Sequence, residues 1–211
     1  AGLARVFGKQ DQAERLLKEA ASLQERFERA FWSEKLGSYA LALDGRGRPC
    51  LVRCSNAGHC LYGGIAGRKR ALRTARTLLT DEMFSGWGIR TLATSETRYN
   101  PMSYHNGSVW PHDNALIAAG MAAYGYREGA MKVLTGLFDA SLFLDLHRMP
   151  ELFCGFPRRP GESPTRYPVA CAPQAWAAGA GFQALQACLG LQIDGARGLV
   201  QFVSPVLPPF L

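Results

Sequence analysis

Two kinds of helical pattern alternate along this 211-residue chain, and the alternation restricts its fold more than any other feature of the sequence. The segments with apolar residues on one face and charged residues on the other are 11–31, 68–79 and 127–146. The segments that are apolar on nearly every side are 55–62, 114–124 and 174–191. A one-sided helix covers a core, whereas an all-apolar helix is itself covered, so we predict alternating outer and inner helices.

The connections between these segments alternate in length. The long ones are 32–54, 83–111 and 149–173, and short turns at 63–67 and 125–126 separate them. Successive connections fall at opposite ends of an array of antiparallel helices, so the three long ones are expected at one end. Structureless loops of this length are uncommon unless they are functional. We therefore predict a shared mouth that includes Tyr39, Trp87, residues 99–114 and Glu151.

Three outer and inner helix pairs do not close a ring. We therefore predict an all-α fold in which the chain, as a single domain over residues 1–211, forms an arc of a double-layer helical toroid. A small β-hairpin is expected in the first long connection, where residues 39–43 precede an Asp-Gly turn. The apolar inner helices at the two open sides of this arc would need to be buried, either by an N-terminal half of the same protein or by a second copy in a homodimer.

Composition excludes several function classes. Hydrophobic residues make up 47% of the chain and charged residues 19%, which is ordinary for a globular domain of this length. No apolar run reaches the length of a membrane span and no signal peptide is recognisable, so we expect a cytoplasmic protein with no membrane partner. The net charge of +7 comes mainly from helix faces such as 68–76. No nucleic-acid motif accompanies those residues, so no nucleic-acid partner is expected.

The cysteine and histidine residues suggest no cofactor. The six cysteines are scattered rather than dense, and we interpret them mostly as buried thiols. Cys50, Cys54, His59 and Cys60 lie near one another in sequence, but their spacing matches no standard pair of zinc knuckles. No motif in the chain calls for a metal ion or an organic cofactor.

Residues 99–114 concentrate groups that suit a carbohydrate. Their aromatic rings could stack on sugar faces, and their amide, imidazole and carboxylate groups could bind hydroxyls. The candidate substrate-binding residues are Trp87, Tyr104, His105, Asn106, Trp110, His112, Asp113, Gln174 and Trp176. Trp110 beside Pro111 could equally be core packing, and a single histidine is often structural. Residues 99–114 place many polar groups in one segment that leads into a buried helix. Packing alone explains these groups poorly, because buried polar groups need partners.

Two carboxylates are candidates for chemistry, because glycoside hydrolysis needs one proton donor and one base or nucleophile. Glu151 lies among Pro150, Leu152 and Phe153, which is an unusual setting for a charge. The alternative for Glu151 is a salt bridge to Arg148, Arg158 or Arg159. Asp113 is expected in the first turn of a helix, where the helix dipole favours its ionised form. Asp113 therefore suits a base or a hydroxyl-binding group better than an acid, and a structural helix-start residue is its alternative.

Four segments resemble the C-terminal part of bacterial amylo-α-1,6-glucosidases of the glycogen-debranching type: 84–92, 99–114, 149–155 and 167–177. The resemblance implies an (α/α)6 toroid, about half of it present here, with inverting α-glucosidase chemistry. It implies that Glu151, in Pro-Glu-Leu, is the general base, and that Gln174 to Trp176 support the site. The family's acid, an Asp in a Gly-Arg-Asp type motif, has no counterpart, because Gly45-Arg46 is followed by Gly47.

Three functions remain open from the sequence. The first is inverting hydrolysis of α-1,6-glucosidic branch linkages in an α-glucan oligosaccharide or polysaccharide, with this chain supplying the base. The second is a non-catalytic carbohydrate-binding or scaffold fragment. The third is a related toroid glycosidase that acts on another sugar, such as a trehalose or mannosyl glycoside, because one architecture can serve many substrates.

Overall fold

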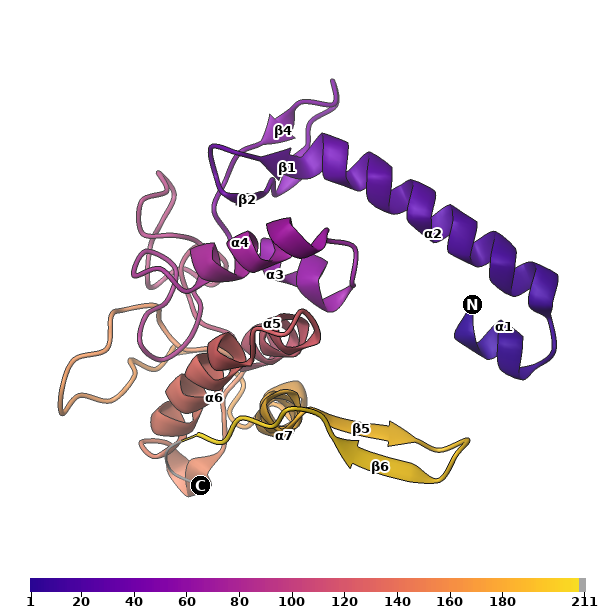
Figure 1. Cartoon of the computed structure of the whole chain (residues 1–211). Coiled ribbons are helices and arrows are strands. Elements are labelled where there is room, and N and C mark those ends of the chain that lie inside the picture. Colours follow the sequence, from indigo (N-terminus) through magenta and orange to yellow (C-terminus); the bar gives the residue numbers. More distant parts are fainter. Residues whose placement is uncertain (209–211) are drawn as a thin grey trace.

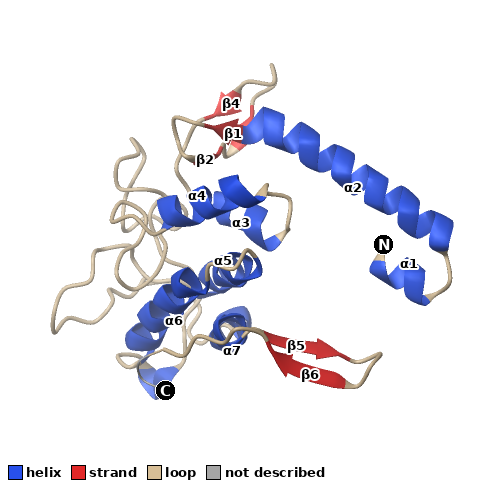
Figure 2. Cartoon of the chain, in the orientation of Figure 1, coloured by secondary structure: helices blue, strands red, loops and turns tan. Residues whose placement is uncertain are grey.

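The computed structural model describes residues 1–208, and these are mostly helical (Figure 2). The helices are α1 (Gly2–Val6), α2 (Gln10–Phe31), α3 (Asn56–Tyr62), α4 (Arg68–Leu78), α5 (Pro111–Ala123), α6 (Arg127–Ser141), the 3-10 helix η1 (Asp145–His147) and α7 (Ala175–Leu189). The strands are β1 (Trp32–Ser33), β2 (Ser38–Tyr39), β3 (Ala42–Leu43), β4 (Pro49–Cys50), β5 (Leu191–Asp194) and β6 (Leu199–Phe202). Each sheet is an antiparallel pair, β1–β2, β3–β4 and β5–β6.

All six predicted helices are present, with shifted boundaries. Helix α5 begins at Pro111 instead of 114, because proline fits the first turn, where its missing N–H costs nothing. Helix α6 ends at Ser141 instead of 146, because the N–H groups of Phe143 and Leu144 turn back to carbonyls three residues earlier. The short helix α1 was not predicted from the sequence.

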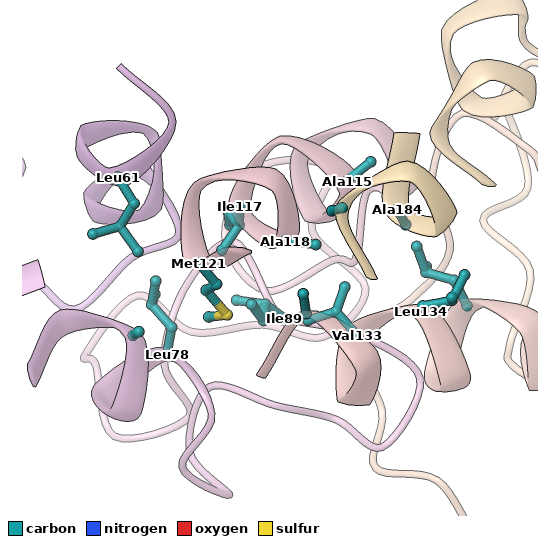
Figure 3. Close-up of a cluster of buried hydrophobic side chains, with 14 of the residues drawn as sticks. Leu61, Leu78, Ile89, Ala115, Ile117, Ala118, Met121, Val133, Leu134 and Ala184 are labelled. Atoms are coloured by element: carbon teal, nitrogen blue, oxygen red, sulfur yellow. The ribbon is translucent and has the colours of Figure 1, made fainter. Parts of the chain in front are cut away.

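Helix α5 is the centre of the core. It packs against α3, α4, α6 and α7, and its residues are buried along nearly the whole length, as its mostly apolar sequence predicts. Figure 3 shows Ile117, Ala118 and Met121 of this helix among side chains of the neighbouring helices. Its approach to α3 is close, since a Cβ on Gly58 would lie 2.5 Å from the Cγ1 of Ile117. This close packing fixes the distance between the side chains of α3 and those of α5.

Helix α2 extends away from this core and packs mainly through its C-terminal end (Figure 1). Leu17 and Leu23 on its apolar stripe are 44% and 50% exposed, although the pattern predicts a covered stripe. Near its end, Phe27 stacks on Phe31 and contacts Tyr39, whose hydroxyl donates a hydrogen bond to Glu28. The expectation that Tyr39 lies at the mouth is therefore wrong: the side chain is 1% exposed, because its ring completes an aromatic cluster.

The three long connections meet, as their alternation predicts. Isolated β-bridges join Cys54 to Leu92, Arg90 to Val109, and Phe153 to both Val109 and Arg166. The expected hairpin of the first connection is present as two smaller hairpins, β1–β2 and β3–β4. Ala40 and Leu41 separate strand β2 from strand β3. The bridged segments lie beyond one end of α5, on the left of Figure 1.

The C-terminal segment forms the β5–β6 hairpin, in which Ile193 pairs with Val200. The sequence of residues 199–209 predicts a short strand followed by an extended finish, and the helical pattern before it extends to 191. Helix α7 ends at Leu189 because Gly190 adopts a left-handed conformation, with φ of 60°, that stops the helix. The last residue of the predicted extended finish, 209, lies outside the described residues. Within residues 1–208, every helix is too short or too polar to cross a bilayer.

Candidate functional site

Glu151 lies where the bridged connections meet, and its carboxylate faces hydroxyl and amide donors. The Tyr104 hydroxyl donates a hydrogen bond of 2.7 Å to Oε1, and the Cys171 N–H donates one of 3.4 Å to Oε2. The backbone N–H of Glu151 donates to the Cys171 carbonyl at 2.8 Å, which fixes the main chain beneath the side chain. The residue is 9% exposed. A carboxylate this buried, held by neutral donors, is available to accept a proton from a bound molecule.

The salt-bridge alternative for Glu151 is absent from the described part of the chain. Arg158 pairs with Asp139 at 2.5 Å, and Arg159 pairs with Glu162 at 3.7 Å. Arg148 has no carboxylate partner within residues 1–208 and lines a cavity of about 220 Å³ that also includes Pro150. The negative charge of Glu151 is therefore compensated by hydrogen bonds instead of by an arginine.

Aromatic side chains form a wall beside Glu151. The ring of Tyr104 contacts His105, Trp110 and Tyr167 edge-on, with centroid separations of 4.6, 4.9 and 5.6 Å. The hydrogen bond from Tyr104 to Glu151 raises the pKa of the Tyr104 hydroxyl to about 12, so this hydroxyl remains a donor at neutral pH. His105 lies parallel to Trp110, with their planes 4° apart and their centroids 5.9 Å apart. Flat rings beside a carboxylate suit a sugar.

The wall continues onto the start of α7. His112, on α5, stacks on Trp176 with a centroid separation of 3.9 Å and an interplanar angle of 12°. Trp110 contacts both of these rings edge-on. Burial lowers the pKa of His112, although the negative charges of Asp113 and Glu151 favour its protonated form. The uncharged imidazole therefore predominates at neutral pH.

Two glycines let the Glu151 connection touch the 99–110 segment. A Cβ on Gly155 would lie 1.6 Å from the Gly107 carbonyl oxygen, so no other residue fits at position 155 without a backbone shift. The Gly155 carbonyl accepts hydrogen bonds from Arg90 Nε at 2.7 Å and from the Tyr99 hydroxyl at 3.1 Å. Arg90 is 2% exposed, and its guanidinium donates to the backbone carbonyls of Gly155, Asp81 and Glu82. It joins the 81–82 turn to the Glu151 connection.

Asp113 is 7% exposed, on the side of α5 that faces α3, where His59 Nε2 lies 2.5 Å from Oδ1. This hydrogen bond raises the pKa of His59 and outweighs the opposing effect of burial. Asp113 makes no side-chain cap, since α5 starts after Trp110 without a capping hydrogen bond. Its Oδ2 has no hydrogen-bond partner within residues 1–208. Asp113 lies in the first turn of α5, as the sequence predicts and as its helix-start alternative requires, but it makes no capping hydrogen bond there.

The structure brings six of the predicted site residues into one chain of contacts: Tyr104, His105, Trp110, His112, Glu151 and Trp176. Trp87 lies elsewhere, 3% exposed, beneath Arg158 and edge-on to Phe143. Asn106 lies on the exposed turn next to His105, where its backbone pairs with Asn100. Gln174 is the half-buried residue before α7, and its N–H approaches the Met149 carbonyl at 3.5 Å.

Sequence reasoning assigned no role to several residues that build this site. Asn114 is fully buried, and its side chain bonds the N–H and carbonyl of Ile89 and the carbonyl of Trp110. Ser108 accepts a hydrogen bond of 2.9 Å from the indole of Trp110 and donates one to the Tyr104 carbonyl. A signal for Asn114 was available, because a lone amide inside an all-apolar helix needs partners. His59 has a similar signal, since it interrupts a mostly apolar segment.

Comparison with known proteins gives a family and a fold. A family model described as the mannosylglycerate hydrolase MGH1-like glycoside hydrolase domain matches residues 1–142. An uncharacterized conserved protein from Thermus thermophilus superposes with a TM-score of 0.65 and 17% identity over 86% of this chain and 42% of its own. The GH63 mannosylglycerate hydrolase from Thermus thermophilus, in complex with Tris, gives 0.62 and 18% over 87% and 40%. Neutral trehalase Nth1 from Saccharomyces cerevisiae gives 0.60 and 15% over 81% and 30%.

These similarities have a defined extent. The chain spans about two fifths of the length of the two Thermus thermophilus structures. No curated protein sequence matches it. The structural likeness supports the expected class of mostly helical toroid glycosidase folds, and the family model covers about two thirds of the chain. The chain therefore belongs to the family of MGH1-like glycoside hydrolase domains.

Proposed function

We propose that this chain carries the general base and part of the sugar subsite of an inverting glycoside hydrolase. The observation that supports the proposal is the setting of Glu151. Its carboxylate is buried, has no ion-pair partner in residues 1–208, and accepts a hydrogen bond from a tyrosine in an aromatic wall. A base for hydrolysis needs a free lone pair and a fixed orientation beside the sugar.

In the proposed reaction, Glu151 accepts a proton from water while the water oxygen attacks the anomeric carbon. The Tyr104 hydroxyl and the Cys171 N–H hold the carboxylate during this transfer. Trp176, which is 50% exposed, would stack on the sugar, and Trp110, which is 8% exposed and packs as a core residue, would support it from behind. Attack by water, without a covalent intermediate, inverts the configuration of the anomeric carbon.

The proton donor to the leaving oxygen would come from outside this chain. Asp113 is a poor candidate for this role, since its Oδ1 already accepts the hydrogen bond from His59. The limited share of the related structures that the chain spans supports the same proposal. The exposed apolar residues of α2 and α7, among them Leu23 and Phe182, would then be covered by the rest of a toroid or by a second copy.

Two substrate classes compete within this proposal. The resemblance of the Glu151 and Trp110 segments to amylo-α-1,6-glucosidases favours an α-1,6 branch in an α-glucan. The family model favours a mannosyl glycoside such as mannosylglycerate at least as strongly. The structure of the Thermus thermophilus mannosylglycerate hydrolase is also known in complex with glucose and in complex with Tris and D-glycerate. A shared hexose subsite with different neighbouring groups would explain both resemblances.

The test combines this chain with the N-terminal portion of a related toroid glycosidase and measures hydrolysis of a branched α-glucan and of mannosylglycerate. We expect one of the two to be cleaved, with the inverted anomer released first. Glu151→Gln should abolish turnover and leave sugar binding intact, because the amide keeps the shape and loses the basic oxygen. Turnover that survives Glu151→Gln would refute the assignment of the base. Sugar binding without hydrolysis of any glycoside would favour a carbohydrate-binding fragment.

A further inference from the structure

The pair formed by His59 and Asp113 lacks a structural explanation. Asp113 is 7% exposed, and transferring a carboxylate from water to a protein interior is costly unless it is fully hydrogen-bonded. Only one of its oxygens has a partner in the described structure, the imidazole of His59. Burial of the carboxylate therefore costs stability, which the hydrogen bond to His59 offsets only in part, and neither a helix cap nor a second ion pair adds to that offset. Such a cost is typical of a functional group.

The two side chains differ in solvent accessibility. The Asp113 side chain is 10% exposed and the His59 side chain is 44% exposed, so the carboxylate is buried beneath the imidazole, which reaches the surface. His59 uses Nε2 to bond Asp113, and its Nδ1 has no partner within residues 1–208. A buried carboxylate that bonds one ring nitrogen fixes the orientation of the ring and leaves the other nitrogen to face outward.

The pair lies next to the aromatic wall. Asp113 follows His112, whose ring stacks on Trp176 and contacts Trp110. The charges of Asp113, His59 and Glu151 all act on His112. The close approach of α3 and α5 at Gly58 and Ile117 keeps His59 in register with the first turn of α5. The imidazole of His59 therefore lies on the α3 side of α5, close enough to His112 for the two rings to interact electrostatically.

We propose that His59 is a ligand-binding residue of this site, which donates a hydrogen bond from Nδ1 to a hydroxyl oxygen of the bound glycoside, and that Asp113 is its positioning residue. The inference rests on the proposed glycosidase function and deepens it by adding the inner helix α3 to the sugar subsite. A protonated imidazole paired with a carboxylate is neutral as a unit, so it suits a neutral hydroxyl better than an anionic group. The raised pKa of His59 agrees with a ring that carries both protons.

The experiment measures binding of methyl α-glucoside, methyl α-mannoside and their singly deoxygenated derivatives to the 211-residue chain by NMR, with the Trp176 indole as the reporter. We expect one deoxy derivative to bind about ten-fold more weakly than its parent, since a hydrogen bond to a charged group is lost. In His59→Phe, which keeps a flat ring, that derivative and its parent should bind with equal affinity. Asp113→Asn should reduce the difference in affinity between the two glycosides without removing it. His147→Phe, in the exposed η1 segment, is the control and should retain the full difference.

A purely structural role for His59 predicts a different result: the variants would weaken binding of all derivatives by the same factor. That outcome, or a wild-type chain that binds none of the glycosides, would overturn the inference. Tighter binding of an anionic derivative that depends on His59 would overturn the assignment of a hydroxyl. Failure of the proposed function is seen separately, in the hydrolysis assay with Glu151→Gln.

Discussion

Gly155→Ala tests whether the Glu151 connection must touch the 99–110 segment. The new Cβ would lie 1.6 Å from the Gly107 carbonyl oxygen, and real Cβ atoms essentially never come closer than 3.0 Å. The two backbones must therefore separate by at least about 1.4 Å, which is the difference between these distances. Because both segments are backbone at this point, no side-chain rotation can relieve the contact.

The cost follows from the hydrogen bonds that depend on this contact. The Gly155 carbonyl accepts two hydrogen bonds, from Arg90 and Tyr99, and Val109 and Phe153 exchange two more at 2.9 and 3.0 Å. Loss of two to four such bonds, at about 1 kcal/mol each, predicts a destabilisation of about 2–4 kcal/mol. A displacement of about 1 Å at Glu151 would also reduce catalysis by about 10²-fold in a complemented enzyme.

Urea denaturation of wild type and Gly155→Ala measures the first effect. The matched control is Gly179→Ala, in α7, where a new Cβ meets no atom within 4 Å. The control should be stabilised by up to about 1 kcal/mol, because alanine favours a helix over glycine. Equal stability of Gly155→Ala and wild type would refute the close approach of the two segments.

Three further predictions concern other parts of the site. Asn114→Ala should lower the free energy of unfolding by about 3 kcal/mol in urea, because the buried N–H and carbonyl of Ile89 lose their partner and the Trp110 carbonyl loses one of its two donors; a loss below about 1 kcal/mol would contradict this. The pKa of His59 is raised in the folded chain, so its ion pair should stabilise the fold below about pH 6.5 and lose this effect as pH rises through the raised value. The difference in unfolding free energy between wild type and His59→Phe, measured above the range in which carboxylates protonate, should shrink with rising pH, and a growing difference would reverse the assigned sign. The isolated chain should not hydrolyse branched α-glucan, because it lacks a proton donor, and turnover that Glu151→Gln abolishes in this chain would show that the donor is present.

The order of the helices could be predicted because it depends on local chemistry. Charged residues on one face of α4, and the apolar sequence of α5 after its first turn, identify an outer and an inner helix directly. The position of the long connections then follows from antiparallel packing, and the bridges from Cys54 to Leu92 and from Val109 to Phe153 confirm it.

The contacts within the site could not be predicted in the same way. The partners of Asp113 and Glu151, His59 and Tyr104, are 54 and 47 residues away, and only the folded geometry selects them. Tyr39 was misplaced because an aromatic residue in a long connection suits a sugar site and a buried cluster equally well. Tyr39 is buried because its ring packs against Phe27 at the end of α2. No pattern in the sequence shows this long-range contact.

The account depends on Glu151 as the base of an inverting hydrolysis. The most direct measurement is the anomeric configuration of the first product released by the complemented enzyme, followed by NMR, in wild type and in Glu151→Gln. The account predicts an inverted product from wild type and no product from the variant. A product with retained configuration, or an equal rate from both enzymes, would contradict it.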